Sequence, residues 1–484
     1  MTGKLLCRSL LALALLAQTL APAAADNINL PDLGDSSATV ISPSQEKRLG
    51  EDFMRRARQS LALSDDPELN GYVQTLGQRL LAQTETSYRD FQFFVVNDSS
   101  INAFAVPGGF VGVHRGLVLA TQDEAELASV MAHEITHVTQ KHIPRLIAES
   151  QRTNLPAMAA ILASILLAST GHGSGASAGI MATQAAVAQH GINFTRSFEE
   201  EADRIGMTTL ARAGFDPNGM PAFFERLQML NRHNDTDLPE FLRTHPVTAN
   251  RIADARNRAE RLPKVVSRDS EDYLNVHAKL RAQERGSDVE IVRGFRDNLE
   301  QGKYREINAE RYGYALALLR ARELSAARVE TQKLLAHRPN RVYYRILQAE
   351  IEMAGNQPKQ ALAIYEQTEK IAPNHPGLLR YHAEALLKNG QPQRAQELLK
   401  NAVRNNPNDP TLYGLLAQAA NAANNPLDSY KAAAEQFYLN GNPQGAIEQL
   451  RLALKQAGDN FYQASSIEAR IAAIRDEIAL FEAK

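Results

Sequence analysis

The chain has 484 residues, of which 44% are hydrophobic and 22% charged, and its formal net charge at pH 7 is −2. This length is sufficient for two or more packed domains, and the nearly balanced charge argues against nucleic acid as a partner. The single cysteine, Cys7, excludes a disulfide within the chain and a zinc site built from cysteines.

The first 25 residues have the pattern of a secretory signal peptide. Lys4 and Arg8 precede an apolar run over residues 10–20, and the small residues at 23–25 form a cleavage site before Asp26. Cys7 lies before the apolar run, so it is removed with the peptide and does not carry a lipid. We therefore expect the mature chain, from residue 26, to be exported and to contain no thiol.

Residues 133–137 read HEITH and predict half of a zinc site with its general base. Positions i and i+4 of a helix lie on one face, so His133 and His137 would direct two imidazoles at one point. Glu134 would lie beside the open coordination position, where it could accept a proton from a water bound to the metal. The motif therefore supplies two ligands and a base.

The residues around this motif predict an amphipathic helix. Thr121 and Glu124 form a capping box, and Pro144 is expected to end the helix. The alternative, two solvated histidines on a surface helix, fits poorly because the neighbouring positions are apolar. The other histidines of this region have no metal-binding spacing and are expected on the surface or in loops: His114, His142 and His172.

An apolar segment follows the motif. Residues 155–170 are almost wholly apolar, a glycine-rich break follows, and a second alanine-rich stretch extends to residue 189. The first run is shorter than the roughly 20 residues that span a bilayer. Two interpretations remain open: a helical hairpin in the core beneath the metal site, or a mobile lid that contacts a membrane or an unfolded barrel strand.

The acidic run at residues 199–203 predicts the remaining ligand. Glu199 and Asp203 are four residues apart and share one face of a helix. We expect Glu199 to be the third zinc ligand and Asp203 to hydrogen-bond a ligand imidazole or the substrate. Alternatively, the run is a solvated helix start stabilised by the helix dipole, an interpretation that suits Glu200 and Glu201.

These motifs together resemble the M48 peptidases, whose pattern is HExxH followed by ExxxD. Residues 102–109, NAFAVPGG, resemble the NAF-x-x-PGG stretch of that family, and Gly116 with Leu117 match its turn into the helix. His245, Pro246 and Arg251 resemble its HP-x-x-x-x-R segment. The resemblance covers residues 45–260 and implies a zincin-like α+β metallopeptidase domain, which we place at 26–265. It also implies the same roles for Glu199 and Asp203.

Two roles remain open for the segment that contains His245 and Arg251. Either residue could donate a hydrogen bond to the oxyanion of the transition state. Alternatively, His245 could bind zinc as a fourth protein ligand, which would displace the catalytic water and keep the enzyme latent. We expect an extended substrate to pair with an edge strand formed by Phe104–Val113.

The chain repeats itself every 34 residues from about residue 309. This period is that of the tetratricopeptide helix-turn-helix unit, so residues 309–484 predict an α-helical superhelix with a concave binding face, after a helical connector at 266–308. Leu324 stands where a proline is expected, and the repeat becomes irregular after Tyr430, as in terminal units. The interval separates four sets of residues: Pro339, Pro373 and Pro407; Pro358, Pro392 and Pro426; Ala315, Ala349, Ala383 and Ala417; Ala327, Ala361 and Ala395.

The predicted fold is therefore mainly α, an α+β zinc metallopeptidase domain followed by a tetratricopeptide superhelix. This order is similar to that of secreted M48 peptidases with C-terminal repeats. The resemblance implies a periplasmic endopeptidase and chaperone with one zinc ion per chain, acting in outer-membrane β-barrel assembly. Its expected partners are unfolded or stalled barrel proteins, including the lipopolysaccharide transporter barrel, and the barrel-assembly machinery, which the repeats would bind.

Two other functions are compatible with the same sequence. One is a repeat-based periplasmic chaperone or scaffold whose zinc site is latent or structural. The other is a housekeeping peptidase without a dedicated partner. Cleavage of an unfolded barrel protein, and its dependence on the repeats, would distinguish these functions.

Overall fold

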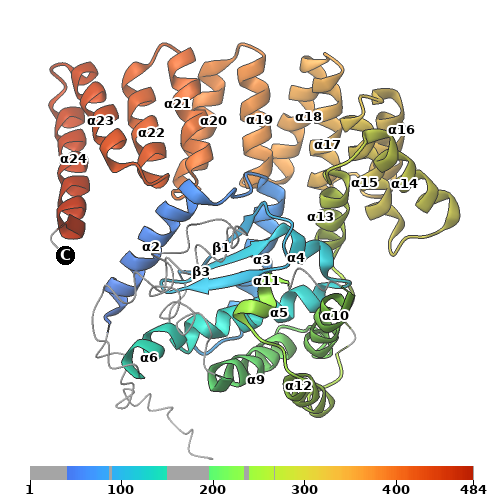
Figure 1. Cartoon of the computed structure of the whole chain (residues 1–484). Helices are drawn as coiled ribbons and strands as arrows, with labels where there is room; N and C mark the ends of the chain where they lie inside the picture. The colour runs from blue at the N-terminus through green and yellow to red at the C-terminus, as the bar shows by residue number, and fades with distance from the viewer. Residues whose placement is uncertain (1–40, 87–89, 150–195, 234–238, 266, 483–484) are drawn as a thin grey trace, which may run out of the picture.

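The computed structural model describes residues 41–86, 90–149, 196–233, 239–265 and 267–482 (Figure 1). The predicted signal peptide and the apolar segment at 155–189 lie outside these residues. Within them, no helix is both long and apolar enough to cross a membrane. The described chain is mainly helical, with one small sheet in the N-terminal half and a helical superhelix in the C-terminal half, which confirms the predicted fold class.

The sheet has the first N-terminal helix on one face, and the second N-terminal helix together with the HEITH helix on the other. It has the order β1-β3-β2, with β1 parallel and β2 antiparallel to the central strand β3. Gly108 and Gly109 make the turn between β2 and β3 at φ 84° and 80°, a conformation that favours glycine. The elements of this part are α2 (Pro43–Ser60), α3 (Pro67–Leu81), β1 (Gln92–Val96), β2 (Ala103–Val106), β3 (Phe110–His114) and α4 (Arg115–Ala120).

The sheet order corrects the expectation that Phe104–Val113 forms an edge strand. Its second half belongs to β3, which is paired on both sides and cannot accept a substrate strand. Among the described strands, β2 pairs with β3 alone, so an extended substrate could add to the sheet next to β2. Just before β2, the carbonyl of Ile101 accepts a hydrogen bond from Phe241 N at 3.1 Å.

The HEITH helix, α5 (Glu124–Thr139), begins and ends differently from the prediction. Its N-cap is Asp123, whose side chain accepts from Glu126 N, whereas the Thr121 hydroxyl donates to Val118 O, so the predicted capping box is wrong. Pro144 does not end α5, because it lies in the first turn of α6 (His142–Glu149). The N–H groups of a first turn have no partner within the helix, so a proline is tolerated there. Residues 124–138 are all buried, so the helix is enclosed rather than amphipathic.

Helix α9 (Arg196–Arg212) crosses α5 at very short range. A Cβ atom at Gly206 would lie 3.1 Å from the backbone nitrogen of His133, which is tighter than ordinary packing. The glycine thus lets α9 place its acidic residues beside the histidines of α5. Three further helices complete this half: α10 (Gly219–His233), α11 (Glu240–Thr244) and α12 (Ala249–Arg261).

The C-terminal half is an arc of paired helices, as predicted from the 34-residue period (Figure 1). Pro358, Pro392 and Pro426 are the first residues of α18, α20 and α22, where proline is tolerated. The array consists of α13 (Glu271–Ala282), α14 (Asp288–Gln301), α15 (Ile307–Arg320), α16 (Leu324–His337), α17 (Val342–Ala354), α18 (Pro358–Ile371), α19 (Pro376–Lys388), α20 (Pro392–Asn405), α21 (Pro410–Ala422), α22 (Pro426–Leu439), α23 (Pro443–Ala457) and α24 (Phe461–Glu482).

The predicted connector at 266–308 contains α13 and α14, which both pack against α15, the first helix of the repeats. One hydrophobic cluster runs from Tyr72 of α3 through Tyr273 of α13 to Tyr344 of α17. The two halves of the chain therefore share a core, and the first helix pairs of the array are part of the support for the peptidase half.

Charged contacts join the two halves at two more places. Lys279 of α13 is buried and pairs with Glu68 and with Asp66, the latter at 2.7 Å. At the other end of the array, Arg58 of α2 donates to Leu439 O at 2.6 Å, and Arg55 lies 2.7 Å from Glu477. The array is thus fixed to the peptidase half near its beginning and near its end.

Candidate metal centre

The predicted site residues come together from four helices or their ends. His133, Glu134 and His137 lie on α5, and Glu199 and Asp203 lie on α9. His245 follows α11 as its C-cap, and Arg251 lies in the first turn of α12. All seven residues are at most 4% exposed. The nitrogen and oxygen atoms of four of them lie within 4.8 Å of one another: His133, His137, Glu199 and His245.

The spacing of these atoms suits a tetrahedral zinc ion. With zinc–ligand bonds of about 2.0–2.1 Å, neighbouring ligand atoms are about 3.3 Å apart. His133 Nε2 lies 3.0 Å from His137 Nε2 and 3.4 Å from His245 Nδ1. Glu199 Oε1 lies 3.4 Å from His137 Nε2 and 3.0 Å from His245 Nδ1. Three imidazole nitrogens and one carboxylate oxygen thus face a common centre, which is a donor set typical of zinc.

Glu134 lies at the edge of this group. Its carboxylate is buried, and burial raises its pKa above the usual range despite the opposing effect of His245 and His133. A raised pKa suits a general base that must also release the proton near neutral pH. Its Oε1 lies 3.4 Å from His245 Nε2, and Nδ1 of the same imidazole lies 3.0 Å from Glu199 Oε1, so His245 contacts both carboxylates.

Asp203 and Arg251 contact this group of side chains from outside. Asp203 Oδ1 lies 3.0 Å from His133 Nδ1, on the side of the ring away from the other ligands. Arg251 donates to both oxygens of Asp203, at 2.7 and 2.8 Å, and its Nη1 lies 2.9 Å from Glu199 Oε2. Burial alone would raise the pKa of Asp203, but the hydrogen bonds from Arg251 and His133 lower it. The guanidinium of Arg251 thus binds two carboxylates of the site.

His245 is held by contacts on both sides of its backbone. Its N–H donates to Phe241 O at 2.8 Å, and the ring of Phe241 stacks on its imidazole with centroids 4.8 Å apart. The carbonyl of the next residue, Pro246, accepts from Arg251 Nη1 at 2.8 Å. The α11 segment therefore places His245 in a defined position at the metal ligands.

Two histidines predicted on the surface or in loops are buried. His142 is fully enclosed, and its Nδ1 lies 2.9 Å from His137 Nδ1. His114 is 1% exposed and its Nδ1 lies 2.8 Å from the Ser100 hydroxyl. Burial lowers the pKa of each of these histidines to about 4. His142 was missed because α5 ends at Thr139 and Lys141 adopts φ 52° before α6 begins, so helical spacing does not reveal its position.

Comparison with known proteins gives the same two parts. The model of "Peptidase family M48" matches residues 67–259, and that of "Tetratricopeptide repeat" matches residues 352–419. The chain is 37% identical to the "Beta-barrel assembly-enhancing protease" of Escherichia coli (strain K12), over 94% of this chain and 93% of the relative. It is 36% identical to the protein of that name from Yersinia pestis, over 92% and 91% of the two chains.

A more distant relative shares the peptidase half. The "Mitochondrial metalloendopeptidase OMA1" of Schizosaccharomyces pombe is 30% identical over 42% of this chain and 56% of the relative. The match to the M48 model, the match to the tetratricopeptide model and the buried group of zinc-type donors all point to the same family. The chain therefore belongs to the M48 family of zinc metallopeptidases and, within it, to the β-barrel assembly-enhancing proteases.

Proposed function

We propose that this chain is a periplasmic zinc endopeptidase of outer-membrane barrel assembly and that His245 keeps it latent. The observation that carries the proposal is the four-donor group His133, His137, Glu199 and His245. A catalytic zinc site of this class uses three protein ligands and keeps one position for water or substrate, whereas four protein ligands close the site. The residues that a zinc peptidase needs are therefore present, and His245, as the fourth donor, would occupy the position that water or substrate requires.

The chemical roles follow from the contacts. His133, His137 and Glu199 would hold zinc, which would supply Lewis-acid chemistry for the attack of water on a peptide carbonyl. Glu134 accepts the proton of that water and delivers it to the leaving amine. Asp203 keeps a proton on Nδ1 of His133, so that Nε2 presents its lone pair to the other ligands.

The contacts of Arg251 favour a positioning role over an oxyanion role. Its guanidinium is already bound to Asp203, Glu199 and Pro246 O. A donor to the transition state would have to leave one of these buried acceptors unpaired, at a cost of several kcal/mol for a charged partner. We therefore assign Arg251 to holding Glu199 and Asp203 in place.

His245 closes the site in two ways. Its Nδ1 takes the fourth ligand position, and its Nε2 faces the carboxylate of Glu134. The segment that carries it also donates Phe241 N to Ile101 O, next to the strand β2 to which a substrate would add. Withdrawal of α11 would thus free three things together: the proposed metal ligands, the proposed base Glu134, and the beginning of β2, to which a substrate would add.

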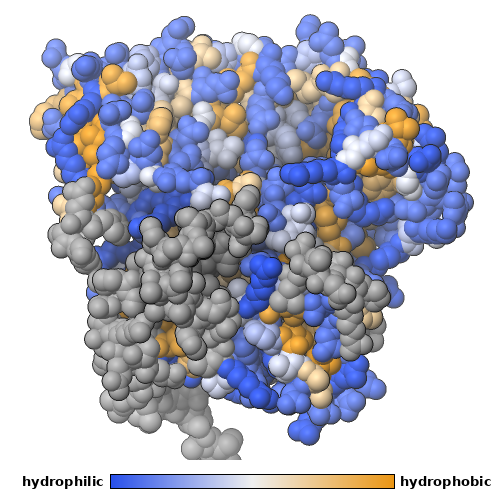
Figure 2. All heavy atoms as spheres, in the orientation of Figure 1, coloured by the Kyte–Doolittle hydropathy of each residue, from blue (hydrophilic) through white to orange (hydrophobic). Residues whose placement is uncertain are grey.

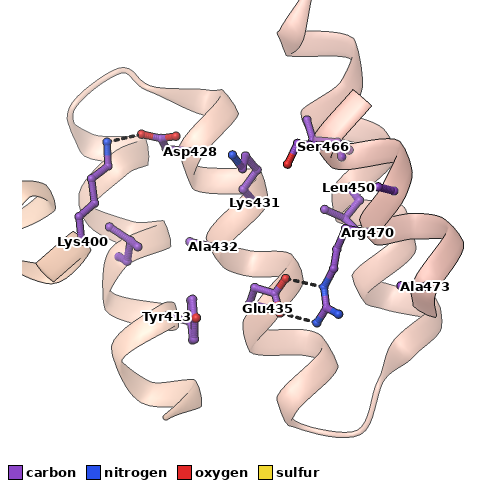
Figure 3. A pocket seen from close by; sticks show the side chains of 13 residues that line it. Lys400, Tyr413, Asp428, Lys431, Ala432, Glu435, Leu450, Ser466, Arg470 and Ala473 are labelled. Carbon is purple, nitrogen blue, oxygen red and sulfur yellow. Dashed lines mark hydrogen bonds and ion pairs between the residues drawn. The ribbon is translucent and has the colours of Figure 1, made fainter. Parts of the chain in front are cut away.

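The repeat array is proposed to bind the barrel-assembly machinery. Its C-terminal end has a groove of about 540 Å³, lined mainly by α22 and α24 (Figure 3). The groove has apolar walls at Leu416, Leu450 and Ile467, and its rim carries the ion pairs Lys400–Asp428 and Arg470–Glu435. Figure 2 shows hydrophobic atoms in stripes between hydrophilic ones on this side of the array. Such a surface suits a protein partner.

The proposed substrates are unfolded or stalled barrel proteins. The proposal rests on the names of the relatives, on the signal-peptide pattern at residues 1–25 and on the peptidase chemistry of the centre. Edge-strand addition tolerates many sequences because main-chain atoms make the hydrogen bonds. A barrel strand that has failed to pair is an extended segment of the required kind.

The second candidate is a repeat-based chaperone whose zinc site is structural, which the same four-donor group would also suit. The test is cleavage of an unfolded barrel protein by the wild type and by Glu134→Gln, with the zinc content of both measured. The peptidase proposal expects cleavage by the wild type alone, once the assembly machinery has displaced His245, and equal zinc in both proteins, because Glu134 is not a proposed ligand. Equal zinc without cleavage by either protein, with and without the assembly machinery, would favour the chaperone.

A further inference from the structure

His142 lies outside the proposed ligand set but in contact with it. Its Nδ1 is 2.9 Å from Nδ1 of His137, and its Nε2 is 3.3 Å from Oε2 of Glu201. Glu201 in turn accepts a hydrogen bond from Arg145 Nη1 at 2.9 Å. A continuous line of polar contacts thus leads from a proposed zinc ligand on α5, through α6, to a partly exposed carboxylate on α9.

We infer that His142 and Glu201 position His137 for zinc, as a hydrogen-bonded relay that fixes the tautomer and the ring plane of this ligand. The inference rests on the ligand set proposed above. In it, His137 Nδ1–H donates to His142 Nδ1, and His142 Nε2–H donates to Glu201.

The direction of the relay follows from the proton count of a neutral imidazole. His137 presents Nε2 to the other ligands, so its lone pair is there and its single proton is on Nδ1. That N–H requires an acceptor, and His142 Nδ1 lies 2.9 Å from it. His142 must therefore carry its own proton on Nε2, where the carboxylate of Glu201 accepts it. One arrangement of protons satisfies all three groups.

The ring of His142 is also held in its plane. It stacks on Phe198 with centroids 4.6 Å apart and an interplanar angle of 12°. The guanidinium of Arg145 lies 4.7 Å from the centroid of the same Phe198 ring while it holds Glu201. The relay is thus packed on one side and hydrogen-bonded at both nitrogens, which is the construction expected of a group that orients a ligand.

Both histidines of HEITH have a carboxylate partner on the side away from the proposed zinc position. Asp203 contacts Nδ1 of His133 directly, whereas Glu201 reaches Nδ1 of His137 through His142. Each proposed ligand histidine of HEITH therefore has its own carboxylate from α9. Loss of such an outer partner commonly costs roughly 10- to 100-fold in metal affinity.

The test measures zinc affinity of the full chain by competition with a chelator, for Glu201→Gln, His142→Phe and His142→Asn. Glu200→Gln is the matched control, because Glu200 is exposed and pairs with the exposed Arg196. We expect H142F to raise the zinc Kd by roughly 10- to 100-fold and E200Q to leave it unchanged. E201Q should raise it by less, because its amide oxygen still accepts from His142 Nε2–H but carries no negative charge. H142N should recover most of the affinity, because its amide oxygen can accept from His137 Nδ1–H.

A purely structural role would give a different result. The visible spectrum of the cobalt-substituted protein should change in E201Q and not in E200Q, while the melting temperature of the metal-free protein stays the same. The inference is overturned if E201Q binds zinc as tightly as E200Q, or if H142N is as weak as H142F. His137→Ala separates the two proposals: if it keeps wild-type zinc affinity, the ligand set itself is wrong. E201Q keeps the test valid if H142F does not fold.

Discussion

His245 Nε2 lies 3.4 Å from Glu134 Oε1, while Nδ1 of the same ring lies 3.0 Å from Glu199 Oε1. One imidazole thus contacts both the proposed base and a proposed zinc ligand. A residue that stabilises the oxyanion would leave room for a substrate carbonyl between itself and Glu134. His245 leaves no such room, because its ring contacts Glu134 directly. The latch interpretation therefore accounts for its position better than a catalytic one.

The close crossing of α5 and α9 should control metal binding. Gly206→Val would push α9 away from the backbone of His133 and displace Glu199 and Asp203. We expect the zinc Kd to rise at least about tenfold, because ligands must be held within about 0.5 Å of the productive geometry. Gly294→Val is the matched control, since a Cβ at this helical glycine meets nothing within 4 Å. Equal zinc affinity in both variants would contradict the argument.

The buried Lys279 should be essential to the joint between the two halves. Lys279→Ala leaves Asp66 and Glu68 buried without their cation, which typically costs about 3–5 kcal/mol. Lys333→Ala, which removes an exposed pair with Glu330, should cost about 0–1 kcal/mol. Urea unfolding of both variants measures the difference. Similar midpoints for the two would show that the buried cluster contributes little.

Stability should fall in mild acid in part because of His114. Burial lowers its folded pKa to about 4, so between pH 6.5 and 4 the unfolded chain binds a proton that the folded chain does not. The contribution of His114 to the free energy of unfolding is fully present above pH 6.5 and is lost as the pH falls to 4. It amounts to about 3 kcal/mol. His114→Asn removes this proton uptake, so its unfolding free energy should depend less on pH across that window. Parallel pH curves for variant and wild type would refute the assignment.

The groove in the repeat array should be required for partner binding but not for chemistry. Ser466→Trp would fill the groove from α24, where Ser466 is exposed. We expect it to weaken co-purification with the barrel-assembly machinery while cleavage of a short unstructured peptide is unchanged. Glu468→Trp, exposed on the same helix outside the groove lining, is the control. Unchanged co-purification with S466W would place the contact elsewhere.

Deletion of the repeats is a poor test of their function. Tyr273, Tyr312 and Tyr344 of the array belong to the same hydrophobic cluster as Tyr72 of the peptidase half. Removing the chain after about residue 305 would expose part of that cluster to water, so lost activity would not distinguish partner binding from unfolding. Substitutions within the groove avoid this difficulty.

The parts that the sequence predicted well depend on local spacing. His133 and His137 are one helical turn apart, and Pro358, Pro392 and Pro426 recur with the repeat, so their positions follow from helix geometry and period. The residues that were missed depend on contacts between segments far apart in the chain. His142 reaches His137 across the break between α5 and α6, and its second partner lies on α9. Lys279 meets Glu68 only because the array folds back on the peptidase half.

The most direct test of latency is the rate at which His245→Ala cleaves an unfolded barrel protein, compared with the wild type at equal zinc content. His133, His137 and Glu199 remain in the variant, so zinc should be retained while the fourth position opens and Glu134 is freed. We expect His245→Ala to have a higher kcat/KM than the wild type. The double variant His245→Ala, Glu134→Gln should not cleave the substrate. A zinc-loaded His245→Ala that cleaves no faster than the wild type would contradict the latch.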